Sequence, residues 1–61
     1  MKEHNARTAF EIDKNFYVEF DDEFGQWGVF GDDTGFCYSL TSSQSEADDK
    51  AAALNNRKSL S

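Results

Sequence analysis

Two four-residue segments that begin with Asp and end with Gly constrain the fold of this chain more than any other feature of its sequence. They are Asp22-Glu23-Phe24-Gly25 and Asp32-Asp33-Thr34-Gly35, ten positions apart. Asp at the first position and Gly at the last suit a type I turn that ends in a left-handed glycine and joins antiparallel strands. Gly adopts the positive φ of such a turn at little cost. The pattern therefore predicts two successive hairpins.

The segments on either side of these turns alternate apolar and other residues with a period of two, which is typical of strands with one face in a core. They cover positions 16–20, 27–30 and 36–40. Aromatic residues make up 15% of the chain and all lie before position 40, which favours a packed sheet over a disordered acidic tail. With the two turns, these segments predict an up-and-down meander of three antiparallel strands.

Upstream of the first of these segments, Phe10 and Ile12 keep its even-numbered parity. We therefore expect a strand to begin between Ala9 and Asn15. It is either the start of one long bent strand or a separate short edge strand.

A helix is predicted after the third strand, because two overlapping capping boxes occur there. These boxes are Thr41 with Gln44 and Ser43 with Glu46. We expect the helix to begin at position 43 or 44 and to end at position 54 or 55, where Asn55-Asn56 would stop it. Its apolar stripe is narrow and consists of Ala47, Ala51 and Leu54. Such small side chains allow a helix to lie close to a sheet.

Together these features predict an α+β domain in which a three-stranded antiparallel β-meander is followed by one C-terminal α-helix packed on one face. The domain is expected to span residues 9–56. Residues 1–8 are expected to form a flexible N-terminal tail, and residues 57–61 a frayed C-terminal tail.

The length of 61 residues limits the stability of such a domain. A chain of this size buries only about 60% of the surface that its unfolded form exposes. Cys37 is the only cysteine, which excludes an internal disulfide and a multi-cysteine zinc site. A protein partner, either a second copy or a host protein, is therefore expected. A single cysteine fits the reducing cytoplasm better than secretion. The sequence also has no apolar segment long enough for a bilayer and no recognisable signal peptide, so we expect a cytoplasmic protein without membrane contact.

The charge of the chain is concentrated in its middle. The net charge is −6, and the segment from Glu11 to Asp49 holds eleven carboxylates and one base, Lys14. Such a surface repels phosphate backbones. We therefore expect no direct binding to nucleic acid.

The carboxylates do not form a recognisable catalytic or calcium-binding pattern. Neither turn has the spacing of acids, Gly and Glu that an EF-hand loop needs. A single small sheet with one helix also leaves little room for a cleft that would shift a pKa. His4, the only histidine, lies in the predicted tail. We therefore expect no catalytic residue, no metal site and no cofactor, and a protein that is not an enzyme.

The candidate interaction residues form an aromatic and an acidic group. The aromatic group is Tyr17, Phe24 and Phe30. Its members lie in a turn or on the parity that a single helix cannot cover, and exposed apolar patches mark interaction sites, although scattered exposed aromatics are also ordinary. The acidic group is Asp21, Asp22, Asp32 and Asp33. The sequence thus predicts a small acidic protein-interaction module; the alternative is an acidic mimic of nucleic acid that occupies the basic groove of a DNA- or RNA-binding protein.

A strand with Trp27 and Val29, a glycine-bearing turn, a Phe-x-Tyr-x-Leu strand and a Ser/Thr-capped helix ending in Ala-Ala-Ala-Leu-Asn follow one another over about residues 16 to 56. This arrangement resembles short uncharacterised proteins of bacteria and their phages. The resemblance implies an accessory protein of a bacterium or phage, a class that includes the small inhibitors that phages direct against host proteins. It transfers no functional residues.

Overall fold

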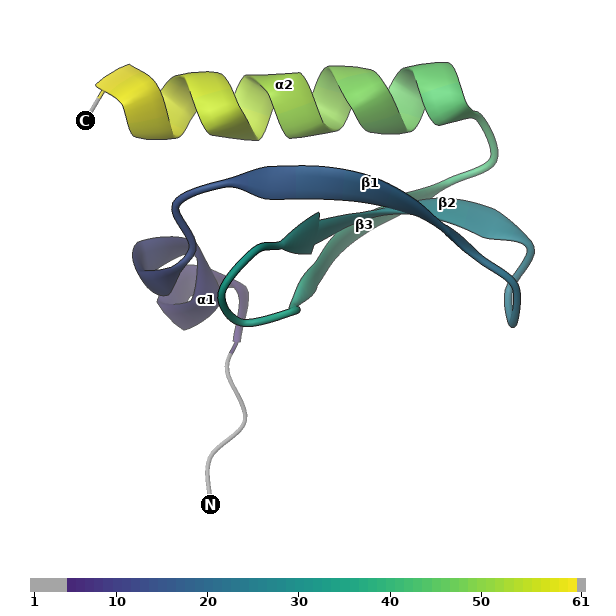
Figure 1. Cartoon of the computed structure of the whole chain (residues 1–61), viewed down its shortest axis with the longest axis horizontal. Coiled ribbons are helices and arrows are strands. Elements are labelled where there is room, and N and C mark those ends of the chain that lie inside the picture. The colour runs from purple at the N-terminus through teal and green to yellow at the C-terminus, as the bar shows by residue number, and fades with distance from the viewer. Residues whose placement is uncertain (1–4, 61) are drawn as a thin grey trace.

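A computed structural model describes residues 5–60 of the chain, which form a sheet of three strands and two helices. The elements in order are α1 (Ala6–Ile12), β1 (Phe16–Asp21), β2 (Gln26–Gly31), β3 (Cys37–Thr41) and α2 (Gln44–Leu60). The strands are antiparallel and lie in the order β1-β2-β3, and α2 lies along one face of the sheet (Figure 1). The predicted β-meander followed by a C-terminal helix is confirmed.

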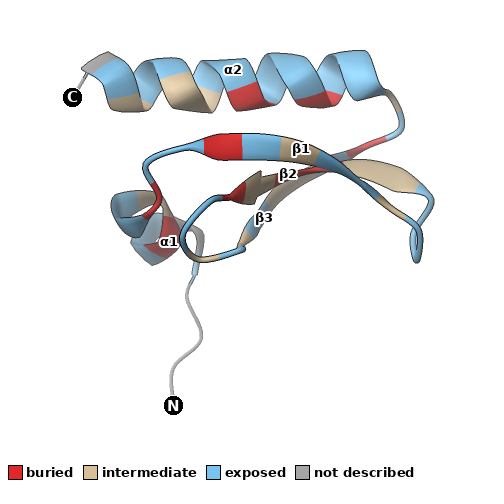
Figure 2. Ribbon diagram, viewed as in Figure 1, coloured by how far each residue is buried: buried red, intermediate tan, exposed pale blue. Residues whose placement is uncertain are grey.

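The core lies between α2 and the sheet and is built on small helix residues. Ala47 and Ala51 of α2 are buried against Phe16 of β1 and Val29 of β2, and the buried positions of α2 face the sheet in Figure 2. Since alanine side chains are short, the helix lies close to the strands. Trp27 packs against this core but is only half-buried.

The segment before β1 forms a helix, and the predicted strand between positions 9 and 15 is wrong. The Asn5 side chain caps this helix by accepting a hydrogen bond from the Thr8 N–H at 2.9 Å, and Asp13 is the cap at its C-terminal end. A local cap thus overrides the alternating parity, and Ile12, expected on the core face of a strand, is exposed. The predicted flexible tail at 1–8 is therefore corrected for residues 6–8, which belong to α1, whereas residues 1–4, with His4, lie outside the described residues.

The second helix begins where predicted but continues to Leu60, beyond the predicted end. The Ser43 hydroxyl accepts a hydrogen bond from the Glu46 N–H at 3.3 Å at its start. Asn55 does not stop the helix, because its side-chain amide bonds the backbone of Phe16, accepting from the N–H at 2.9 Å and donating to the C=O at 3.2 Å. Further along, the Lys58 ammonium lies 4.4 Å from the centre of the Phe10 ring. These tertiary contacts keep the expected frayed segment helical; Ser61 lies outside the described residues.

A bulge in β3 changes which of its side chains face the core. The register shifts by one residue, since Val29 pairs with Ser39 while Phe30 pairs with Cys37. Beyond the bulge, Leu40 pairs with Gly28 and is 40% exposed. Alternation from Tyr38 places Leu40 on the core face; the bulge moves it to the face opposite α2.

Both turns contain the predicted left-handed glycine, because φ is 66° at Gly25 and 73° at Gly35. In the β1–β2 turn the capping side chain belongs to Asp21, one position before the expected Asp22. Its carboxylate accepts from the N–H groups of Glu23 and Phe24 at 2.9 and 3.3 Å. The Asp21 C=O accepts from the Gly25 N–H at 2.7 Å.

The β2–β3 turn has the same pattern of hydrogen bonds as the β1–β2 turn, but the position that matches Asp21 carries no side chain. The position that matches Asp21 is Gly31, whose C=O accepts from the Gly35 N–H at 3.1 Å. The two N–H groups that follow, of Asp33 and Thr34, donate to the Asp13 carboxylate at 2.8 and 2.7 Å. A Cβ at Gly31 would overlap that carboxylate. Asp13, from the end of α1, therefore supplies the acceptor that Gly31 lacks.

Candidate functional site

The face of the sheet opposite α2, which we call the open face, carries a continuous apolar patch. The patch consists of Tyr17, Gly28, Phe30 and Leu40. The rings of Tyr17 and Phe30 lie 5.8 Å apart on neighbouring strands. The Phe30 ring lies over Gly28, since a Cβ there would come within 2.6 Å of the ring and 3.3 Å of Leu40. Tyr17 is 43% and Leu40 40% exposed, so this patch meets solvent.

The aromatic candidates from the sequence divide between two places. Tyr17 and Phe30 meet on the open face, as their parity indicates. Phe24 lies at the tip of the β1–β2 turn and is 67% exposed. The open face also includes Leu40, which sequence reasoning missed because the bulge is not visible in the residue pattern.

The acidic candidates lie at opposite ends of the sheet. Asp21 and Asp22 are at the β1–β2 turn, whereas Asp32 and Asp33 are at the β2–β3 turn (Figure 1). Because β2 joins the two turns, its length separates the two pairs. Asp21 is half-buried and holds its turn, and the other three are exposed. The four residues therefore do not form one acidic surface.

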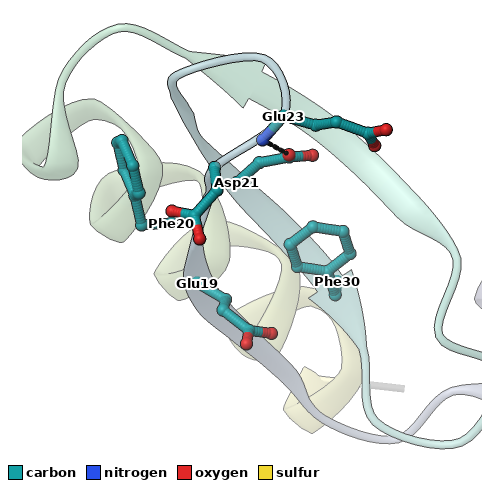
Figure 3. A pocket seen from close by; sticks show the side chains of 6 residues that line it. Glu19, Phe20, Asp21, Glu23 and Phe30 are labelled. Carbon is teal, nitrogen blue, oxygen red and sulfur yellow. Dashed lines mark hydrogen bonds between the residues drawn. The ribbon is translucent and has the colours of Figure 1, made fainter.

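A shallow acidic hollow borders the open face at the β1–β2 end. Its lining residues are Glu19, Phe20, Asp21, Asp22, Glu23 and Phe30, with no lysine or arginine among them. Figure 3 shows the Glu19 and Asp21 side chains on the side of β1 where Phe30 lies, and Phe20 pointing away from them. Glu19 shares the parity of Tyr17, and that signal could have placed it here from the sequence.

One carboxylate of the described residues, that of Asp13, is buried. The hydroxyls of Thr34 and Tyr38 donate to its Oδ2, each at 2.6 Å, in addition to the two backbone donors of the turn. Burial raises the pKa of Asp13, but the hydrogen bonds from Thr34, Tyr38 and Asp33 outweigh it and hold this pKa below its usual value. Burial and the bond to Asp13 raise the pKa of Tyr38. The carboxylate is thus engaged in holding the turn and is poorly suited to accept a proton from a substrate.

Across residues 5–60, no three His, Cys, Asp or Glu side chains gather in a way that could hold a metal ion. Neither helix in this range has both the length and the apolarity to cross a bilayer.

Comparisons of the chain with protein-family models, with curated proteins and with solved structures find no match.

Proposed function

We propose that this chain is a non-enzymatic module that binds another protein through the open face of its sheet. The observation that carries the proposal is the Tyr17–Phe30–Leu40 patch, which is apolar and continuous across all three strands, with Tyr17 and Leu40 exposed and Phe30 half-buried. Contiguous apolar surface of this kind is typical of interaction sites, and aromatic side chains supply much of the binding energy at interface centres. The resemblance to bacterial and phage accessory proteins makes a bacterial protein the partner class that we propose.

A different protein fits this face better than a second copy of the chain. Each copy has a net charge of −6, and the carboxylate of Glu19 lies on the open face itself. Packing two such faces together would bring like charges to one interface, which disfavours the dimer. We therefore commit to a heterologous partner.

Affinity capture from a bacterial lysate with matched variants tests the proposal. Tyr17→Ser with Leu40→Ser removes apolar surface from the open face, and Ile12→Ser removes an equally exposed apolar side chain from α1. We expect a protein that wild type and Ile12→Ser retain and the double variant loses. Its affinity, measured calorimetrically with purified components, should fall by about 30-fold or more, since an anchor residue contributes about 2 kcal/mol.

The proposal fails if every captured protein is retained equally by the double variant, with all variants folded by circular dichroism. The alternative is a nucleic-acid mimic, and the four carboxylates that we named for it lie as two pairs at the two ends of the sheet rather than on one surface (Figure 1). Capture of a nucleic-acid-binding protein that is lost only when both pairs are neutralised would favour the mimic instead.

A further inference from the structure

We infer that the segment of the partner that docks on the open face is basic, with an arginine or lysine side chain that enters the acidic hollow beside Phe30 while its apolar neighbours cover Tyr17 and Leu40. This inference rests on the proposed function and adds the chemistry of the partner to it.

The charge around the apolar patch selects this chemistry. Glu19 lies on the open face itself, and Asp22 and Glu23 line the hollow where the patch ends, with no base among the lining residues. A neutral apolar partner that covered the patch would remove water from these carboxylates without supplying hydrogen bonds or an opposite charge, which costs free energy. A basic side chain at this point pairs with them instead and keeps the apolar contact.

The hollow also offers a suitable aromatic surface to a cation. Phe30 and Phe20 are its two aromatic lining residues, and carboxylates of β1 and the β1–β2 turn make up the rest of the lining. In Figure 3 the Phe30 ring lies on the side of β1 where the Glu19 and Asp21 carboxylates lie. A guanidinium group can lie against a ring and bond a carboxylate at the same time. Elsewhere the chain itself contains contacts between a cation and an aromatic ring: Lys58 and Arg57 lie 4.4 and 5.8 Å from the centre of the Phe10 ring.

Two synthetic peptides probe the inference directly. One has the sequence Gly-Leu-Arg-Phe-Arg-Leu-Gly with blocked ends, and the other has glutamine in place of both arginines. Titration of nitrogen-labelled wild-type protein followed by NMR should show roughly tenfold tighter binding of the arginine peptide at about 50 mM salt, with the difference reduced at about 300 mM. The shifted amides should be those of the open face and the hollow.

Matched charge variants identify the site. Glu19→Gln with Asp22→Asn and Glu23→Gln removes three charges at the hollow. Glu11→Gln with Asp32→Asn and Asp33→Asn removes three exposed charges elsewhere. Asp21 is left unchanged because its carboxylate holds the β1–β2 turn. The first variant should lose most of the preference for the arginine peptide, and the second should change its affinity by less than about twofold.

Several results would overturn the inference. They are equal affinity for the two peptides, equal loss in both triple variants, no binding of either peptide, or amide shifts confined to α2. If the captured protein requires Tyr17 and Leu40 but binds normally to the triple variant at Glu19, Asp22 and Glu23, the inference of a basic partner segment is wrong and the proposed function stands. If it requires neither, the proposed function fails with it. Self-association through the open face that the arginine peptide does not compete with would identify a second copy as the occupant.

Discussion

Asp13→Asn is expected to destabilise the fold more than the same type of change at any exposed carboxylate. The substitution keeps the shape of the side chain but replaces an oxygen acceptor with an NH2 group. In the native protein all four groups that face this carboxylate are donors: the N–H groups of Asp33 and Thr34 and the hydroxyls of Thr34 and Tyr38. An amide oxygen can satisfy one pair of them, and the other pair faces the NH2 group.

The expected cost follows from the number and type of these bonds. A hydrogen bond to a charged group contributes about 1.5–3 kcal/mol, and a hydroxyl can rotate to accept from an amide instead of donating. Loss of the charge and partial loss of two bonds should therefore lower the free energy of unfolding by about 2–3 kcal/mol. A chain of this length has a total stability of roughly 3–9 kcal/mol. The variant should be close to the limit of folding.

Urea unfolding followed by circular dichroism measures this cost, with Asp33→Asn as the control because the Asp33 side chain is exposed. Acid supplies a second test. The folded pKa of Asp13 lies below its unfolded value, so the unfolded chain binds more protons in acid. The ionised Asp13 carboxylate makes its full contribution to the free energy of unfolding above the unfolded pKa, near 3.8, and this contribution is lost as the pH falls through the folded pKa. The difference in free energy of unfolding between wild type and Asp13→Asn should therefore decrease as the pH falls through that range. Equal stability of the two proteins at neutral pH would refute the assignment of the Asp13 carboxylate as the acceptor that holds the β2–β3 turn.

Three further substitutions test the contacts that hold the fold. Gly31→Asp alone should be strongly destabilising because the new side chain would overlap Asp13. Combined with Asp13→Ala it should recover stability, because the new carboxylate can cap its own turn, and a double-mutant cycle measures this recovery. Additive losses of stability would contradict the equivalence of the two turns. Asn55→Ala should lower the unfolding free energy by about 1–2 kcal/mol, since it removes two bonds to Phe16, and an unchanged urea midpoint would count against this contact. Trp27→Ala should cost about 2–4 kcal/mol, somewhat less than a fully buried aromatic, and a melting temperature like that of wild type would mean that its packing contributes little.

About half of the candidate site could be predicted from the sequence. The parity of Tyr17 and Phe30 places both on the open face, because alternation along a strand is a local property of the backbone. Leu40 could not be placed, because the bulge that turns it outward depends on how β3 pairs with β2. The separation of the two acidic pairs could be predicted as well, because successive hairpins of an up-and-down meander turn at opposite ends of the sheet.

The sequence by itself determined the features that depend on a few neighbouring residues. These are the left-handed glycines of the two turns, the three strands and the start of α2, where a glycine, a residue alternation or a capping serine acts within about four positions. Only the tertiary structure decided the role of Asp13, the continuation of α2 past Asn55 and the position of Leu40. Asp13 bonds a turn about twenty positions away, and Asn55 bonds Phe16 across 39 positions. The partners in such contacts meet only after the chain has folded, so no local pattern reveals them.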